Sequence, residues 1–280
     1  PADIAFPVGW SSAADDYEDS QMLKRNFIFS LCKGQFQWWY DLHGYWYQNK
    51  KRLETVEKCA DIAQAALTKD RTANARVAVI MDEKVSWYMT LDKQFQRALC
   101  WENFYYSFAH IGAPVDLLLL TDLKHADLGM YKVFFMPTCF CLDDSERAVI
   151  EGIKNNKRTL VFYTAAGFMN PDCSDVFSAE YMKDLTGINI KQTNQLFQFR
   201  LTTDDRGSLL KNCADISFGV HLEKPLNFFV DDPDAETLGY YSGRGPTGQA
   251  MKSFNDYKSI YCAVSAMPSE LVRNIIDDAG

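Results

Sequence analysis

The alternation of apolar and polar residues is most informative between residues 131 and 167. An apolar run over residues 133–136 is closed by Pro137, which has no amide hydrogen to extend a strand. Asp143, with a glutamate three residues later, is typical of a helix start, and apolar residues then recur on one helical face. A second apolar run covers residues 159–163. Two apolar strands joined by a helix require a parallel pair, so the pattern predicts an α/β sheet covered on both faces.

Similar patterns continue on both sides of this stretch. Before it, apolar runs predict strands over residues 76–81 and 115–120, with an aromatic-rich helix over residues 92–111 between them. After it, a short helix is expected to end at Gly187, and Ser269 is expected to cap a closing helix. Strands are predicted between those two helices over residues 196–202, 227–230, 236–241, 249–254 and 259–263.

Residues 1–70 show a different pattern, in which one predicted strand lies between two amphipathic helices. The first helix is expected over about residues 15–32 and begins with two aspartates, which favour a helix N-terminus. The second begins after Asn49, a good N-cap residue, and extends to about residue 67. The aromatic run over residues 35–41 predicts the strand between them.

This single strand determines how we expect the domains to be divided. A parallel strand needs neighbours on both edges, so its partners are expected upstream of Pro1, together with the natural N-terminus. The polar stretch over residues 68–74 is expected to link it to the next strand. The sequence therefore predicts an incomplete domain over residues 1–70 and an α/β domain over residues 75–280.

The composition is that of a globular protein and argues against two classes of partner. The chain is 47% apolar and 14% aromatic, which is enough for a packed core in 280 residues. With 29 basic and 37 acidic residues its net charge is −8, and no basic run exceeds three residues, so we expect no nucleic-acid partner. The longest apolar runs are far shorter than the roughly 20 residues of a membrane span, so we expect no membrane partner.

The eight cysteines are expected to be mostly free, buried thiols, because they are spread through apolar or helical surroundings. Free thiols favour a reducing, cytoplasmic compartment, but the location stays open without the natural N-terminus. Cys139-Phe-Cys141 could suggest a metal or a reactive thiol, yet zinc needs four ligands and no second closely spaced pair is present. We therefore expect no metal and no cofactor. The cysteines are Cys32, Cys59, Cys100, Cys139, Cys141, Cys173, Cys213 and Cys262.

The letters GRGPTG at residues 243–248 match a dinucleotide-binding fingerprint. That motif must follow the first strand of a βαβ unit and open a helix, whereas this one lies between two late strands. The stretch is therefore expected to be a hairpin loop.

Two local features bear on chemistry. The turn after the strand at 159–163 reads Thr164-Ala165-Ala166-Gly167, and none of these side chains can attack a substrate, so we expect a scaffold or assembly module without catalytic residues. Trp38, Asp41 and Trp46 are the residue types that contact sugars, because an indole stacks on a sugar face while a carboxylate accepts hydroxyl protons. Aromatic core packing explains most of the same residues.

The order of segments resembles the junction between two domains of a β-galactosidase of glycoside hydrolase family 42 or a close relative. LKRNFIFSLCKGQFQWWYDLHGYWY and KKRLETVEKCADIAQAAL resemble the last helices and the eighth strand of a TIM barrel. RVAVIMDE, PVDLLLLTDL, the stretch over residues 131–168 and AMPSELVRNIIDDAG resemble the trimerisation domain of those enzymes, which is similar to class I glutamine amidotransferases. The resemblance implies a flavodoxin-like three-layer fold with a mainly parallel sheet, preceded by a partial barrel.

The resemblance also implies that this chain does not hydrolyse glycosides by itself, because the two catalytic glutamates of the family would precede Pro1. Amidotransferases carry the motif Gly-x-Cys-x-Gly after a strand. Aligning its last glycine on Gly167 puts Ala165 at the cysteine position, so the nucleophile is absent and the elbow is degenerate.

By the same resemblance, Trp38, Asp41 and Trp46 would contact sugar in the complete enzyme, and the chain would form a homo-oligomer such as a trimer. Two alternatives stay open. One is a stand-alone flavodoxin-like module that binds a small molecule or carbohydrate at its strand ends, near Asp82, Asp122 and Thr164. The other is an amidotransferase-like enzyme that uses the thiol of Cys139 or Cys141.

Overall fold

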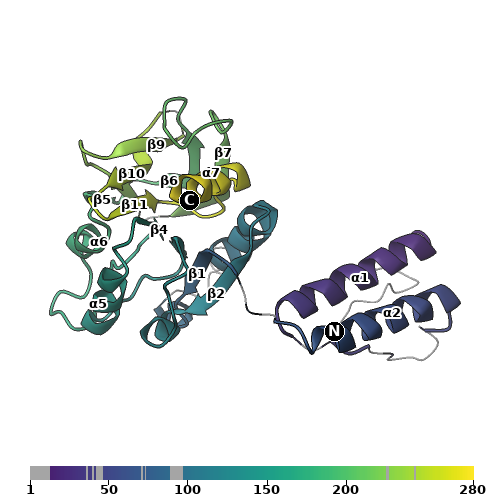
Figure 1. Ribbon diagram of the computed structural model, residues 1–280. Coiled ribbons are helices and arrows are strands. Elements are labelled where there is room, and N and C mark those ends of the chain that lie inside the picture. The colour runs from purple at the N-terminus through teal and green to yellow at the C-terminus, as the bar shows by residue number, and fades with distance from the viewer. Residues whose placement is uncertain are drawn as a thin grey trace. The chain divides into compact units, whose positions relative to one another are not determined.

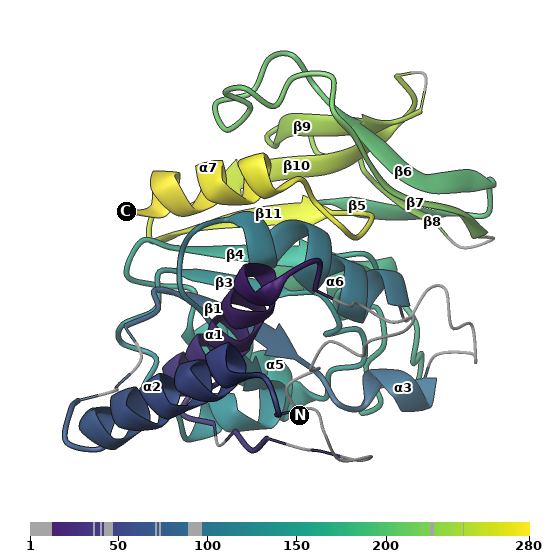
Figure 2. The ribbon, with the colours of Figure 1, turned by 90° about the vertical axis from the view of Figure 1, so that its right-hand side faces the viewer.

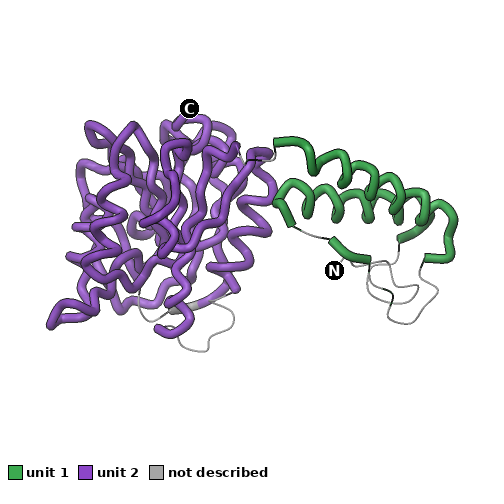
Figure 3. The backbone as a smooth tube through the Cα atoms, turned by 60° about the horizontal axis from the view of Figure 1, so that its bottom comes forward, with its two compact units in different colours: residues 1–73 green, residues 74–280 purple. Residues whose placement is uncertain are grey.

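The chain divides into two compact units, residues 1–73 and residues 74–280, and each is described by itself (Figure 3). The structure is a computed structural model that describes residues 13–35, 37–39, 41, 47–70, 72, 74–88, 97–224, 227–242 and 244–280.

Among the described residues of the second unit, five parallel strands form the centre of the fold (Figure 1). They are β1 Val77–Met81, β2 Val115–Leu119, β3 Val133–Met136, β4 Arg158–Tyr163 and β11 Tyr257–Cys262. Their spatial order is β2-β1-β3-β4-β11, which is the 2-1-3-4-5 order of flavodoxin-like doubly wound sheets. The predicted α/β fold is therefore confirmed, including the parallel pairing of β3 with β4.

Antiparallel strands extend the same sheet beyond β11 and make it mixed as a whole. In spatial order they are β10 Thr247–Ser253, β9 Glu236–Tyr241, β6 Phe197–Thr203 and β7 Ser217–Lys224. β9 and β10 pair directly, so residues 242 and 244–246 lie in the expected hairpin loop, whereas Thr247 and Gly248 already belong to β10. Two further short strands, β5 Ile190–Thr193 and β8 Asn227–Val230, pair with each other.

Helices cover both faces of the parallel strands, which is why every residue of β3 and β4 is buried. On one side α5 contacts α6, and α6 contacts β11; on the other, α7 contacts β4, η1 and η2 (Figures 1 and 2). None of the described helices is long and apolar enough to cross a membrane. The helices are α3 Val85–Tyr88, η1 Arg97–Ser107, η2 Phe108–His110, η3 Leu120–Lys124, α5 Asp144–Gly152, α6 Ala179–Thr186 and α7 Ser269–Ala279.

Local signals at the helix ends act mostly as the sequence predicts. The amide of Glu146 donates to Asp143 Oδ1 at 2.8 Å, and the amide of Asp143 donates to Glu146 Oε2 at 3.1 Å, which is a capping box. Gly187 ends α6 with a φ of 72°, and a Cβ there would lie 2.5 Å from the ring of Phe254. The expected cap at Ser269 is wrong, because Pro268 occupies the N-cap position of α7 without a side-chain hydrogen bond.

The predicted aromatic helix over residues 92–111 is helical where the structure describes it. η1 is a wide helix of the π type, and η2 continues it as a tighter turn. Residues 92–96 lie outside the described residues.

The first unit contains two helices, α1 Asp16–Cys32 and α2 Lys50–Ala66, with the predicted N-caps Asp15 and Asn49. The helices are joined by a largely buried ion pair in which Arg52 Nε lies 2.7 Å from Asp19 Oδ2. Leu23 and Phe27 of α1 and Cys59 of α2 are buried.

The strand expected between these helices is wrong for the residues that the structure describes. None of residues 35, 37–39 and 41 lies in a strand, so the predicted strand is absent from the part of this segment that the structure describes. A strand exists only through hydrogen bonds to neighbouring strands, and the described part of this unit supplies none. Residues 1–12, expected to be loop-like, lie outside the described residues, as do 36, 40 and 42–46.

We predict that Asp143→Ala lowers the free energy of unfolding of the second unit by about 1 kcal/mol, because the first turn of α5 loses its cap. Chemical denaturation measures the change, with Asp234→Ala at an exposed turn as the control. Equal losses in the two variants would show that the capping box contributes nothing measurable.

Candidate functional site

Three polar residues form a row across the carboxyl ends of β1, β3 and β4. Val79 of β1 pairs with Phe135 of β3, so three residues further on Asp82 aligns with Thr138. Met136 of β3 pairs with Phe162 of β4, so Thr138 and Thr164 follow the ends of two adjacent strands. The amide of Asp82 donates to Thr138 Oγ1 at 2.8 Å, which ties the first two members of the row together.

The two outer members of this row carry buried polar atoms that have no hydrogen-bond partner among the described residues: Asp82 Oδ2 and Thr164 Oγ1. Asp82 and Thr164 are only 3% and 7% exposed, so bulk water does not readily supply the missing hydrogen bonds. A buried polar atom left unpaired costs roughly 1–3 kcal/mol. Thr164 also has a φ of 52°, a left-handed conformation that is rare for a β-branched residue and costs on the order of 1–3 kcal/mol.

Charged groups surround Asp82. Its Oδ1 accepts from the amide of Lys84 at 3.0 Å, and Lys84 Nζ lies 2.5 Å from Glu146 Oε2 at the start of α5. Burial raises the pKa of Asp82 to about 6, against smaller opposing effects of Lys84. A carboxyl group with a raised pKa at the end of a parallel strand is a typical feature of functional sites.

The turn after β4 lacks a nucleophile, and the alanine at the corresponding position has a packing role. Ala165, which the resemblance aligns with a catalytic cysteine, packs against a small apolar cluster of Val85, Leu99 and Phe140. Gly167 has a φ of 64°, and a Cβ there would lie 2.7 Å from Leu185 Cδ2. The left-handed residue directly after β4 is Thr164, one position before Ala165; the sequence marks it as a strand-end position but does not indicate its left-handed backbone. Its position immediately after an apolar run was the available signal.

The two cysteines near this edge are poor nucleophiles. Burial raises the pKa of Cys139 well above the ordinary value, and the pKa of Cys141 is raised by burial as well. All eight cysteines are free, and among the described residues no three His, Cys, Asp or Glu side chains cluster in a way that could hold a metal ion.

The predicted sugar-contacting residues lie in the first unit. Trp38 is 57% exposed and Asp41 is exposed, whereas Trp46 is outside the described residues. Their role in sugar contact therefore stays a prediction.

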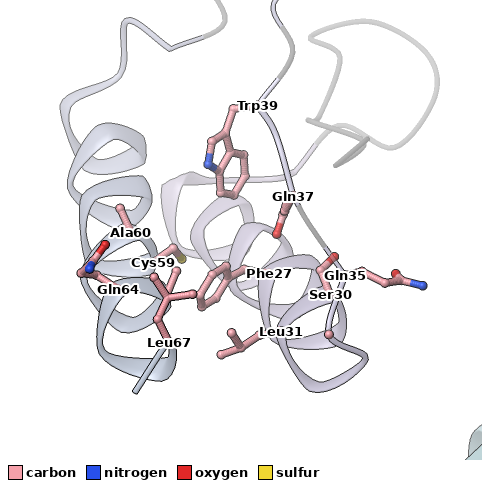
Figure 4. A pocket seen from close by; sticks show the side chains of 12 residues that line it. Phe27, Ser30, Leu31, Gln35, Gln37, Trp39, Cys59, Ala60, Gln64 and Leu67 are labelled. Carbon is pink, nitrogen blue, oxygen red and sulfur yellow. The ribbon is translucent and has the colours of Figure 1, made fainter. Parts of the chain in front are cut away.

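The neighbouring Trp39 lines a cavity of about 410 Å³ between α1 and α2. Figure 4 shows its indole directed towards Phe27 of α1 and Cys59 of α2. Seven of the twelve lining residues are apolar and none is charged, so this cavity suits an uncharged group better than a charged one.

The fold defines the second unit as a three-layer α/β domain with a polar row at the carboxyl ends of its central strands. No family model matches the chain, and no curated protein matches it by sequence.

Several solved β-galactosidases have a similar fold. A GH42 β-galactosidase from G. stearothermophilus matches with a TM-score of 0.63 at 14% identity, over 97% of this chain and 41% of that one. The β-galactosidase from Rahnella sp. R3 matches with a TM-score of 0.62 at 14% identity, over 97% and 42%. That from Bacillus circulans sp. alkalophilus matches with a TM-score of 0.61 at 16% identity, over 85% and 35%. The likeness to GH42 β-galactosidases that the sequence predicted is thus confirmed at the level of fold, and the chain spans about a third to two fifths of their length.

We predict that the folded protein loses stability as the pH rises through the range of about 4 to 6, because native Asp82 holds its proton more tightly than unfolded Asp82. This contribution is fully present below the unfolded pKa and absent above the folded one. Asp82→Asn removes it, so the variant gains up to about 3 kcal/mol relative to wild type between pH 4 and pH 8.

Denaturation series at several pH values measure this effect, with Asp234→Asn as an exposed control. Parallel pH profiles for wild type and Asp82→Asn would contradict the raised pKa.

Proposed function

We propose that this chain is a non-catalytic part of a β-galactosidase-like glycoside hydrolase, one that holds subunits together and supports the active site. The observation that carries the proposal is the fold likeness, which extends over 97% of the chain and so includes both units. On this proposal residues 1–70 are the C-terminal end of a TIM barrel, and residues 75–280 are a trimerisation domain that resembles class I glutamine amidotransferases.

The first unit has the surface expected of a piece of a larger layer. Its two helices pack on each other, yet Phe29, Ile62 and Leu67 are 62%, 48% and 64% exposed. Isolated apolar side chains are normal on a surface, but several on a two-helix segment fit further packing partners. In the complete enzyme these partners are the remaining barrel strands and helices, and Trp38, Asp41 and Trp46 contact sugar.

The second unit supports a structural role because its elbow is filled by packing. Ala165 lies in the apolar cluster with Val85, Leu99 and Phe140, where a thiol nucleophile would need a polar, activating neighbour. The amidotransferase-like alternative would have to use Cys139 or Cys141, whose pKa values are raised by burial.

Exposed aromatic residues on η1 support subunit contacts. Trp101 and Tyr105 are 62% and 56% exposed, and their rings lie nearly parallel, at 12°, with centroids 6.4 Å apart. Tyr106 is also 56% exposed and meets Tyr105 edge-on. Aromatic residues are enriched at protein interfaces, so this surface is our choice for the contact between copies of the chain.

We predict that the purified chain does not hydrolyse aryl-galactosides, since the catalytic carboxylates belong to other barrel strands. Release of the chromophore is followed against a buffer blank and against an intact β-galactosidase as the positive control. Hydrolysis by the chain that persists after further purification would refute the non-catalytic assignment.

We predict that the chain forms a trimer of about three times its 32.0 kDa mass. Replacing both Trp101 and Tyr105 with alanine is expected to shift the population to monomers, whereas Leu196→Ala, at an equally exposed apolar position, is not. Size-exclusion chromatography with light scattering measures the mass. A wild-type monomer would overturn the proposed assembly role, and a trimer unaffected by the double variant would place the interface elsewhere.

A further inference from the structure

The polar row at the end of β1, β3 and β4 lies where this type of sheet binds ligands. From β1 the chain continues into β2, which lies on one side of β1, and then into β3, which lies on the other side of β1. The strand order therefore reverses between β1 and β3. In open α/β sheets, ligands bind outside the carboxyl ends of the strands at such a reversal. Asp82 and Thr138 are the residues on either side of it, and Thr164 follows on the next strand.

The unpaired atoms of the row define what a ligand must offer. Asp82 Oδ2 needs a hydrogen-bond donor, whereas Thr164 Oγ1 can donate or accept. Hydroxyl groups satisfy both. An anion is disfavoured, because the carboxylates of Asp82 and Glu146 would repel it, and the ammonium group of Lys84 is already paired with Glu146. A metal ion is disfavoured too, because no described group of three metal-ligating side chains exists.

The spacing of the row indicates the size of the ligand. Neighbouring strands lie about 4.8 Å apart, so two strand intervals separate the backbones of Asp82 and Thr164 by about 10 Å. A ring that carries hydroxyl groups at opposite ends can reach both side chains across this distance. A single water molecule reaches one of them at a time.

Aromatic rings lie on the element that follows Asp82. The short helix α3 carries Trp87 and Tyr88, which are 77% and 47% exposed. An interaction of the Tyr88 hydroxyl with the thiol of Cys141, in the segment that follows β3, raises the pKa of Tyr88. The C–H face of a sugar can stack on such rings, and so can the ring of a cyclic polyol such as inositol.

We propose that the carboxyl ends of β1, β3 and β4 form a binding site for a monosaccharide or cyclic polyol, held by hydrogen bonds to Asp82 Oδ2 and Thr164 Oγ1. The site lies wholly in the second unit and needs no hydrolase activity, so it stands or falls separately from the proposed function. It also accounts for two unpaired buried polar atoms and a left-handed threonine within one row, which packing alone does not require.

The test is titration of the whole chain with galactose, glucose, mannose and myo-inositol, followed by calorimetry and by the shift in thermal unfolding. At least one of these probes is expected to bind saturably to the wild type. Asp82→Asn replaces the charged acceptor with a neutral amide, and Thr164→Val removes the hydroxyl, while both keep the side-chain volume; each is expected to weaken binding about tenfold or more. Asp234→Asn is expected to leave binding unchanged.

Two further variants separate this site from the cavity of the first unit. Trp39→Ala changes that cavity and is expected to leave binding intact, whereas Tyr88→Ala is expected to weaken it. Circular dichroism confirms that each variant is folded. No binding by any probe would overturn the proposal, as would binding that survives both Asp82→Asn and Thr164→Val or that disappears with Trp39→Ala.

Discussion

The structure depends on one constraint, the pairing of buried backbone groups in the central parallel strands. Every residue of β3 and β4 is buried, so their amides and carbonyls can be satisfied only by neighbouring strands. β1 and β11 supply that pairing, and the layers of helices follow because both faces of these strands are apolar. The guanidinium of Arg158 secures the start of β4 by donating to the carbonyls of Leu128 and Tyr131 in the segment before β3.

The same pairing creates the polar row. Parallel strands in fixed register end at a common level, so the residues that follow them become neighbours although they are far apart in sequence. Asp82, Thr138 and Thr164 are brought to the same end of the sheet in this way. The sheet is stable enough to hold two unpaired polar atoms and a left-handed threonine at its edge, and such local strain is characteristic of sites that bind a ligand. Ala165, the residue after Thr164, packs instead against the apolar cluster of Val85, Leu99 and Phe140.

The two units differ in how much apolar surface each of them buries within itself. The second unit has a large continuous core from β1 to α7, with fully buried side chains on both faces of the sheet. The first consists, in its described part, of a helix pair held by a narrow stripe around Leu23, Phe27 and Cys59 and by the pair of Asp19 with Arg52. This contrast is one support for the proposal that the second unit is an assembly domain and the first unit the end of a barrel.

The sequence by itself determined the local elements that have a periodic apolar pattern or a capping residue at one end. Apolar runs placed β1, β3 and β4, and the capping box at Asp143 and the left-handed Gly187 placed the ends of α5 and α6, because these signals act within a few residues. Only the tertiary structure decided that residues 35–41 form no paired strand in their described part, since pairing is a property of neighbours. It also revealed β5 and β7, strands whose sequences carry charged and polar residues at intervals. The sequence already marked Asp82 and Thr164 as strand-end residues, but their position beside each other and beside Thr138 needed the register of three strands, which no local pattern contains.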